Sequence, residues 1–192
     1  MTPSLDQDAA LMVRVRQGDG ASFAILLDKH QPAVLRFIYR KIRNRALAEE
    51  LAQEVFLRVY RSRHTYQPTA KFSTWLFRIA THLALNAVRD SKKDAWHERL
   101  SDAPVSGAIL QISDGRPSVE DRMLHEVTLR EVRRAIEELP EVQRAAVLMQ
   151  RYQEMEYADI ARILNCSQSA VKSLMFRAHE ALRDRLAYLS AA

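Results

Sequence analysis

Apolar residues recur at helical spacing through the first half of the chain. Leu47, Leu51, Val55 and Val59 form a stripe along one face of a continuous helix. Similar spacing recurs in neighbouring segments, and Pro32 is expected to start a new helix or to kink the one that contains it. The predicted helices of this half cover residues 10–17, 22–43, 46–61 and 72–90.

The helix predicted for residues 72–90 has two distinct faces. Ser73 can cap its first turn. Its apolar face is formed by Trp75, Leu76, Ile79, Ala80, Leu83 and Ala87. Its second face carries Arg78, Thr81, His82, Leu85, Asn86 and Arg89.

The helical pattern stops near Lys93 and returns near Val119. The intervening segment carries several acidic side chains together with proline and glycine, which predicts a flexible acidic linker. The pattern as a whole predicts an all-α protein with two helical domains, the second containing a helix-turn-helix. The expected boundaries are 1–93 for the first domain, 94–121 for the linker and 122–192 for the second domain.

The segment Tyr157–Phe176, YADIARILNCSQSAVKSLMF, fits a helix-turn-helix position by position. Asn165 falls where the chain must turn with positive φ, a conformation that asparagine tolerates best after glycine. Cys166 is expected to be a small buried residue inside the turn, and Ser167 to be the N-cap of the second helix. The buried side of the first helix is predicted to consist of Ile160, Ala161 and Leu164.

The second helix of the pair is predicted to pack through Val171 and Leu174 onto Ala161, whose small side chain allows a close crossing. An ordinary helical hairpin with a polar outer face would show part of this pattern. The turn residue, the cap and the packing pair together favour a DNA-reading unit that suits the major groove. Its outward positions are Gln168, Ser169, Lys172, Ser173 and Arg177.

The composition is that of a soluble helical protein, and its basic charge suits a polyanionic partner without requiring one. Of the 192 residues 47% are hydrophobic and 28% charged, only 4 are glycine, and the formal net charge is +5. The single cysteine excludes an intramolecular disulfide. There is no secretory signal pattern and no apolar run near the about 20 residues that span a bilayer, so we expect a cytoplasmic protein without membrane insertion.

Motifs of enzymatic chemistry are missing from the sequence. The six histidines are scattered, with no HExxH arrangement, no cysteine pair and no glycine-rich phosphate loop. Adjacent carboxylates such as Glu49 and Glu50 point in different directions on a helix, which does not suit shared acid–base work. We therefore expect no catalytic residues, no metal and no cofactor.

Three blocks, in this order, resemble a bacterial sigma factor of the extracytoplasmic-function (ECF) group. Residues 48–61 resemble the helix that binds core RNA polymerase, residues 72–90 the helix that melts and reads the −10 element, and residues 138–182 the domain that reads the −35 element. The resemblance covers nearly the whole chain outside the linker and the extreme ends. It implies core RNA polymerase and promoter DNA as partners, and an anti-sigma factor as regulator.

Acidic side chains face away from the apolar stripe of residues 48–61. Such a row is usually a solvated helix face, but here it lies in an otherwise basic domain, the Gln53 amide interrupts it, and Phe56 lies near the same edge. The resemblance implies that these residues bind the coiled-coil clamp of the largest polymerase subunit. The implied polymerase contacts are Glu50, Leu51, Gln53, Glu54 and Phe56.

Basic and aromatic residues gather around the helix at 72–90 and the loop before it. Cations bind phosphates and rings stack on unpaired bases, which together suit melted DNA, although Trp75 also fits the core. Relatives often carry asparagine after the Ile-Ala pair, whereas His82 stands nearby here, which leaves the preferred −10 base open. The predicted −10 contacts are Tyr66, Lys71, Trp75, Phe77, Arg78, His82, Asn86 and Arg89.

The −35 contacts implied for the last domain divide by chemistry. Cationic side chains hold phosphates and so position the protein, whereas amides and hydroxyls read base edges. Lys172 can do either. The predicted set is Arg144, Arg151, Ser167, Gln168, Ser169, Lys172, Ser173 and Arg177.

Other functions fit less of the chain. A regulator of duplex operators explains the last domain but leaves the block at 72–90 unexplained. The acidic linker is either a tether or a segment that occupies a basic channel of the polymerase until RNA displaces it. Capture of separated bases requires binding energy and no ATP, so the chain is expected to be a non-enzyme.

Overall fold

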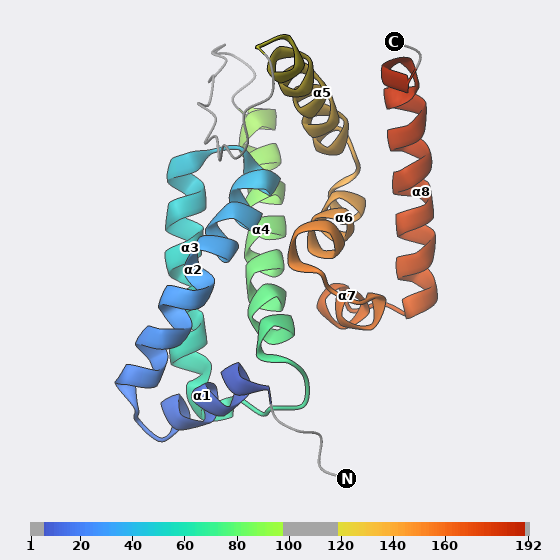
Figure 1. Ribbon diagram of the computed structural model, residues 1–192. Helices are drawn as coiled ribbons and strands as arrows, with labels where there is room; N and C mark the ends of the chain where they lie inside the picture. Colours follow the sequence, from blue (N-terminus) through green and yellow to red (C-terminus); the bar gives the residue numbers. More distant parts are fainter. Residues whose placement is uncertain (1–5, 98–118, 191–192) are drawn as a thin grey trace.

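The computed structural model describes the backbone of residues 6–97 and 119–190, and within these ranges every regular element is a helix (Figure 1). The N-terminal helices are α1 (Gln7–Arg16), α2 (Gly20–Ile42), α3 (Arg45–Arg61), the short 3-10 helix η1 (Ser62–Thr65) and α4 (Phe72–His97). The C-terminal helices are α5 (Val119–Glu137), α6 (Glu141–Gln153), α7 (Tyr157–Leu164), α8 (Gln168–Leu186) and the 3-10 helix η2 (Ala187–Ser190). The all-α prediction is confirmed, while most of the predicted linker lies outside the described residues.

The N-terminal bundle is formed by α2, α3 and α4 with α1 across one end (Figure 1). Pro32 lies inside α2, which runs through it without interruption. Phe37 of α2 meets Phe77 of α4 edge-on, with ring centroids 5.3 Å apart. These contacts close a core around the apolar faces that the helical spacing predicts.

The first turn of α4 is capped from a distance. The carboxylate of Asp6 accepts a hydrogen bond from the Phe72 amide at 2.9 Å and another from the Ala9 amide at 2.6 Å. One carboxylate therefore serves the first turns of both α1 and α4. The prediction of Ser73 as the cap was wrong, because α4 begins one residue before it.

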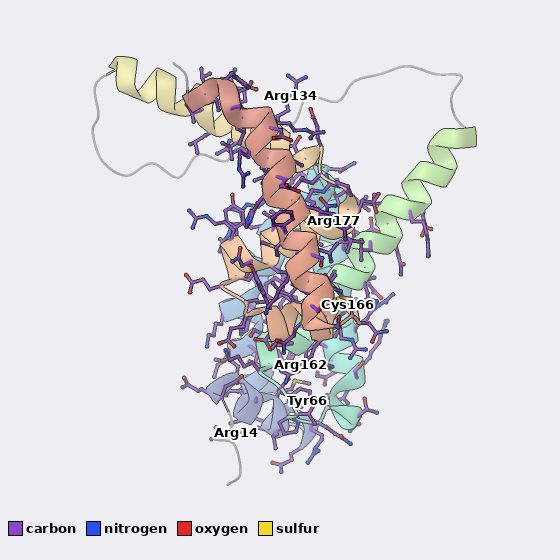
Figure 2. All side chains as sticks on the ribbon, turned by 90° about the vertical axis from the view of Figure 1, so that its right-hand side faces the viewer. Arg14, Tyr66, Arg134, Arg162, Cys166 and Arg177 are labelled. Carbon is purple, nitrogen blue, oxygen red and sulfur yellow. The ribbon has the colours of Figure 1, made fainter. Side chains whose placement is uncertain are left out.

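The C-terminal helices pack directly against the N-terminal bundle. Helix α7 lies between α4 and α8, while α6 contacts α2 and α8 lies outermost (Figures 1 and 2). The hydrophobic core is continuous across this boundary. The described parts of the two predicted domains thus form one packed body.

Candidate nucleic-acid interface

The turn between α7 and α8 has the geometry of a helix-turn-helix. Asn165 ends α7 with φ of 53°, as predicted, and the Ser167 hydroxyl accepts a hydrogen bond from the Ala170 amide at 3.1 Å, which confirms its predicted role as N-cap. Cys166 was predicted to be buried and is exposed (Figure 2). Its amide donates to the Ala161 carbonyl at 3.0 Å and closes the turn, so its backbone rather than its side chain fixes this position.

Ile160 and Ala161 are buried as predicted, and one predicted packing residue in each helix differs from the structure. In α7 Ile163 is fully buried and Leu164 is only partly buried. In α8 Met175 is buried, whereas the predicted Leu174 is only partly buried. Val171, as predicted, is fully buried. The side of α8 that packs inward therefore consists of Val171, Met175 and Ala178.

The first turns of α8 present a row of exposed polar side chains, as expected for a helix that enters a groove (Figure 2). The amides at its start are free of intrahelical partners, so the helix dipole favours a phosphate there. Phe176, which no sequence pattern had indicated, is 62% exposed and lies seven residues after Ser169, on the same face. The row consists of the polar residues Gln168, Ser169, Lys172, Ser173 and Arg177, and Phe176 lies among them.

The two arginines predicted before the turn have different surroundings. Arg151 is exposed near the end of α6. Arg144 is half-buried and donates to the Glu137 carbonyl at 3.0 Å, at the C-terminus of α5. Burial lowers the pKa of its guanidinium. Arg144 is therefore a helix cap here, and its prediction as a phosphate contact is not supported.

The outward face of α4 is basic and polar, but it lacks the aromatic rings that were predicted there. Tyr66 and Phe77 are each only 2% exposed, Trp75 is partly buried, and Thr81, expected on the polar face, is fully buried. These side chains do not lie on an open face, because α4 is covered by α2 and α3 on one side and by the C-terminal helices on another. The exposed members of the set are Lys71, Arg78, His82, Asn86 and Arg89.

Tyr66 lies in an aromatic cluster under the loop that precedes α4. Its ring centroid is 4.8 Å from that of Trp75 and 6.3 Å from that of Phe72. Burial raises the pKa of Tyr66 to about 12, and the carboxylates of Asp6 and Asp8 add to the rise. The cluster anchors the loop to the bundle, so these rings serve packing.

The outward face of α3 matches its prediction in part. Glu50 and Gln53 are exposed, while Leu51 and Glu54 are partly buried. A 2.7 Å hydrogen bond from Arg58 lowers the pKa of Glu54 and keeps it ionised. Phe56 is only 5% exposed and belongs to the core, so its predicted place on the docking surface was wrong.

Comparisons with known proteins match both halves of the chain. Residues 26–94 match the model of sigma-70 region 2, and residues 129–182 match that of sigma-70, region 4. The RNA polymerase sigma-H factor of Pseudomonas aeruginosa is 31% identical over 187 residues, or 94% of each chain. The ECF sigma factor SigW of Bacillus subtilis is 32% identical over 178 residues, covering 90% of this chain and 93% of SigW.

This chain belongs to the ECF sigma factors. The ECF sigma-E factor of Escherichia coli K12 agrees, with 30% identity over 93% of this chain and 94% of that protein. The sigma factor therefore directs core RNA polymerase to promoters and initiates transcription. Its family consists of transcription initiation factors, which are not themselves enzymes.

Solved sigma factors share the fold. RpoE of Bartonella quintana, crystallised with the anti-sigma factor NepR, has a TM-score of 0.69 at 21% identity and covers 85% of this chain and 96% of its own. CnrH, in complex with the cytosolic domain of CnrY, has a TM-score of 0.67 at 19% identity and covers 97% and 99%. Among the described helices of this sigma factor, none is long and apolar enough to cross a membrane.

Proposed function

We propose that the sigma factor uses three separate surfaces: α3 to hold core polymerase, α4 to capture the melted −10 strand, and α8 to read the −35 duplex. The observation that carries this proposal is the exposed polar row on the first turns of α8, directly after a turn of helix-turn-helix geometry. The region 2 match covers α3 and most of α4, and the region 4 match covers α6, α7 and most of α8, which supports this assignment.

The −35 surface contains two groups of residues: readers, which contact base edges, and anchors, which bind phosphates. Gln168 and Ser169, in the first turn of α8, are placed to meet base edges as the helix enters the groove. Lys172 and Arg177 supply cations for flanking phosphates, and Arg151 supplies a third from α6. Phe176 adds an apolar contact of the kind that a thymine methyl group accepts.

The −10 surface works through cations and hydrogen bonds, because the rings of Tyr66 and Phe77 are inside the core and that of Trp75 is partly buried. Arg78 and Arg89 lie eleven residues, or about three turns, apart on α4 and can follow a strand backbone. His82 and Asn86, between them, offer hydrogen bonds to an extruded base. Lys71 extends the cationic path to the loop before the helix.

The polymerase surface combines charge with a partly covered apolar centre. Glu50 and Gln53 are exposed one turn apart on α3, with Leu51 and Glu54 beside them. Carboxylates and an amide around one leucine suit a basic partner helix. The same surface is where an anti-sigma factor would compete with the polymerase.

In this mechanism the polymerase carries out all the chemistry of RNA synthesis. Among the described residues there is no group of three His, Cys, Asp or Glu side chains that could hold a metal ion. The sigma factor contributes binding energy that favours strand separation, and it acts in the cytoplasm with the polymerase.

Promoter-specific run-off transcription tests the proposal. Core polymerase from the source bacterium is combined with the purified full chain and fragmented genomic DNA, and the 5′ ends of the transcripts are sequenced. A sigma factor yields a small set of starts preceded by shared −35 and −10 sequences. Duplex binding without initiation would indicate a conventional regulator and refute the proposal.

A further inference from the structure

The loop between η1 and α4 is held at both of its ends by α1. At the start of the loop the Arg16 guanidinium donates to the Tyr66 carbonyl at 3.4 Å. At its end the Asp6 carboxylate accepts the hydrogen bond from the Phe72 amide. Helix α1 lies across the end of the bundle where α3 connects to α4 (Figure 1). Residues 67–71, which we call the α4 entry loop, therefore lie between two points that one helix fixes.

Packing fixes the same two points. Tyr66 and Phe72 are 2% and 0% exposed, so both residues that flank the α4 entry loop are anchored in the core. The Phe72 ring also lies against the ring of His30 in α2, with centroids 5.3 Å apart. The Nε2 atom of His30 is in turn 2.9 Å from the Asp8 carboxylate of α1. Helices α1, α2 and α4 thus meet at Phe72, and α1 holds both its backbone and the ring beside it.

Between these anchors the loop presents polar groups to solvent. Gln67 and Thr69 are exposed, and the Thr69 amide donates to the Gln67 carbonyl at 2.8 Å, which closes a three-residue turn at Pro68. Lys71 is exposed as well, and its carbonyl accepts a hydrogen bond from the Thr74 amide at 3.1 Å in the first turn of α4. The α4 entry loop therefore continues the cationic and hydrogen-bonding face proposed for the −10 strand.

Helix α1 orders this loop before DNA arrives. Asp6 and Arg16 lie at opposite ends of α1, a 10-residue helix about 15 Å long, so the separation of the two anchors is set by a rigid element. A loop that must be ordered during binding reduces affinity. Discrimination between bases further requires donors and acceptors to be held within about 0.5 Å of the productive geometry.

We propose that Asp6 and Arg16 are positioning residues for −10 selectivity, because α1 holds the α4 entry loop in the conformation in which its polar side chains meet the melted strand. Neither side chain has to touch DNA for this role. Helix α1 thereby belongs to the −10 reader, although it precedes the region 2 match, which begins at residue 26. The inference rests on the proposed function, since it assumes that the start of α4 faces the −10 strand.

Each anchor has a matched control in the same domain. Asp6→Ala removes a carboxylate that accepts two hydrogen bonds, and Asp19→Ala removes one that accepts two from Ser22 in the first turn of α2. Arg16→Met removes the donor to the loop, and Arg14→Met removes the same charge from the same turn of α1. Each full-length variant is combined with core polymerase. Run-off transcription is then measured on a promoter found by the transcript sequencing and on its single-base variants across the −10 element.

The anchoring role predicts a loss of discrimination rather than a loss of folding. Asp6→Ala should reduce the preference for the best −10 base at least about ten-fold relative to Asp19→Ala. Arg16→Met should reduce it less, since its hydrogen bond is the longer of the two, and Arg14→Met should leave it unchanged. Affinities for core polymerase and for the −35 duplex should stay the same. Asp6→Asn should restore most of the preference, because its side-chain oxygen still accepts.

Equal −10 preferences in Asp6→Ala and Asp19→Ala would overturn the proposal. Hydrogen exchange in the free protein tests the anchoring without polymerase or DNA. The Phe72 amide should exchange at least about ten-fold faster in Asp6→Ala than in Asp19→Ala, because its acceptor is gone. Equal exchange rates would show that α1 does not hold the loop and would refute the inference. Failure of the wild-type chain to initiate would refute the proposed function and the selectivity with it, whereas the exchange rates would still report the anchoring.

Discussion

Asp6 and Phe72, 66 positions apart, are joined by a hydrogen bond from the Phe72 amide to the Asp6 carboxylate. The same carboxylate caps α1 through Ala9, so the N-terminal segment and the −10 helix share one anchor. This shared anchor fixes where α4 begins.

Replacement of Asp6 by alanine should destabilise the sigma factor by about 1–3 kcal/mol, because two helix caps are lost together. Asp6→Asn keeps one acceptor oxygen and should lose about half as much. Chemical denaturation monitored by circular dichroism measures both. Equal stability of the alanine variant and the wild type would show that neither cap contributes.

The buried phenol of Tyr66 makes stability depend on alkaline pH. Its pKa of about 12 in the folded protein lies above the ordinary value of 10.0, so the folded state keeps its proton where the unfolded state loses it. This contribution is complete below pH 10 and is lost as the pH rises towards 12. Tyr66→Phe should remove that part of the alkaline loss, as measured by thermal unfolding at a series of pH values.

The turn at Asn165 needs a residue that tolerates positive φ. Asn165→Ala should cost about 1 kcal/mol, because a side chain with a Cβ and no local hydrogen-bonding group is strained there. Asn165→Gly should be close to wild type in stability and in binding of a −35 duplex. If the alanine variant melts at the same temperature as the glycine variant, the strain argument fails.

Two residues of α8 should behave differently on DNA. Gln168→Ala is expected to cost about 1–3 kcal/mol on the preferred −35 duplex and to relax the preference at one base pair. Arg177→Ala should weaken all duplexes alike and reduce the slope of log affinity against log salt by about one. Fluorescence anisotropy over a salt series separates these effects; identical profiles for the two variants would refute the division into readers and anchors.

The acidic face of α3 should determine affinity for core polymerase. Glu50→Lys reverses an exposed charge on the proposed docking surface and should weaken core binding at least about ten-fold, since like charges then meet a basic partner. Asp28→Lys makes the same charge change at an exposed position of α2 and is the control. Competition with wild-type sigma factor for core polymerase measures both affinities, and an equal loss for both would point to net charge alone.

Local rules predicted the helix-turn-helix well because its signals are short-range. Positive φ at Asn165 and the cap at Ser167 depend only on neighbouring backbone. The inward-facing residues of α7 do not follow from local rules in the same way, because Ile163 and Leu164 are adjacent and an eight-residue helix is too short to define one narrow stripe. Tertiary packing decided which of the two is covered.

The errors on α4 have a long-range cause. Thr81 was assigned to the open face because it is polar, yet the Met149 sulfur of α6 lies 3.9 Å from its hydroxyl. The apolar stripe of a helix predicts one buried face, whereas α4 is covered on two faces by helices of both domains. The predictions of Tyr66 and Phe77 as DNA contacts have a related cause. The sequence cannot distinguish an aromatic ring that packs in the core from one that stacks on a base, because both are equally hydrophobic.

The position of α7 limits how this protein can be engineered. Eight residues support the reading helix on one side and meet the N-terminal bundle on the other. In this protein the Thr74 hydroxyl of α4 donates a buried hydrogen bond to the Asp159 carboxylate of α7. A hybrid that joins this N-terminal half to the promoter-reading half of a relative would therefore leave Thr74 without an acceptor wherever the relative has no carboxylate at that position. Such exchanges must transfer the carboxylate of Asp159 along with the specificity residues, or redesign both sides together.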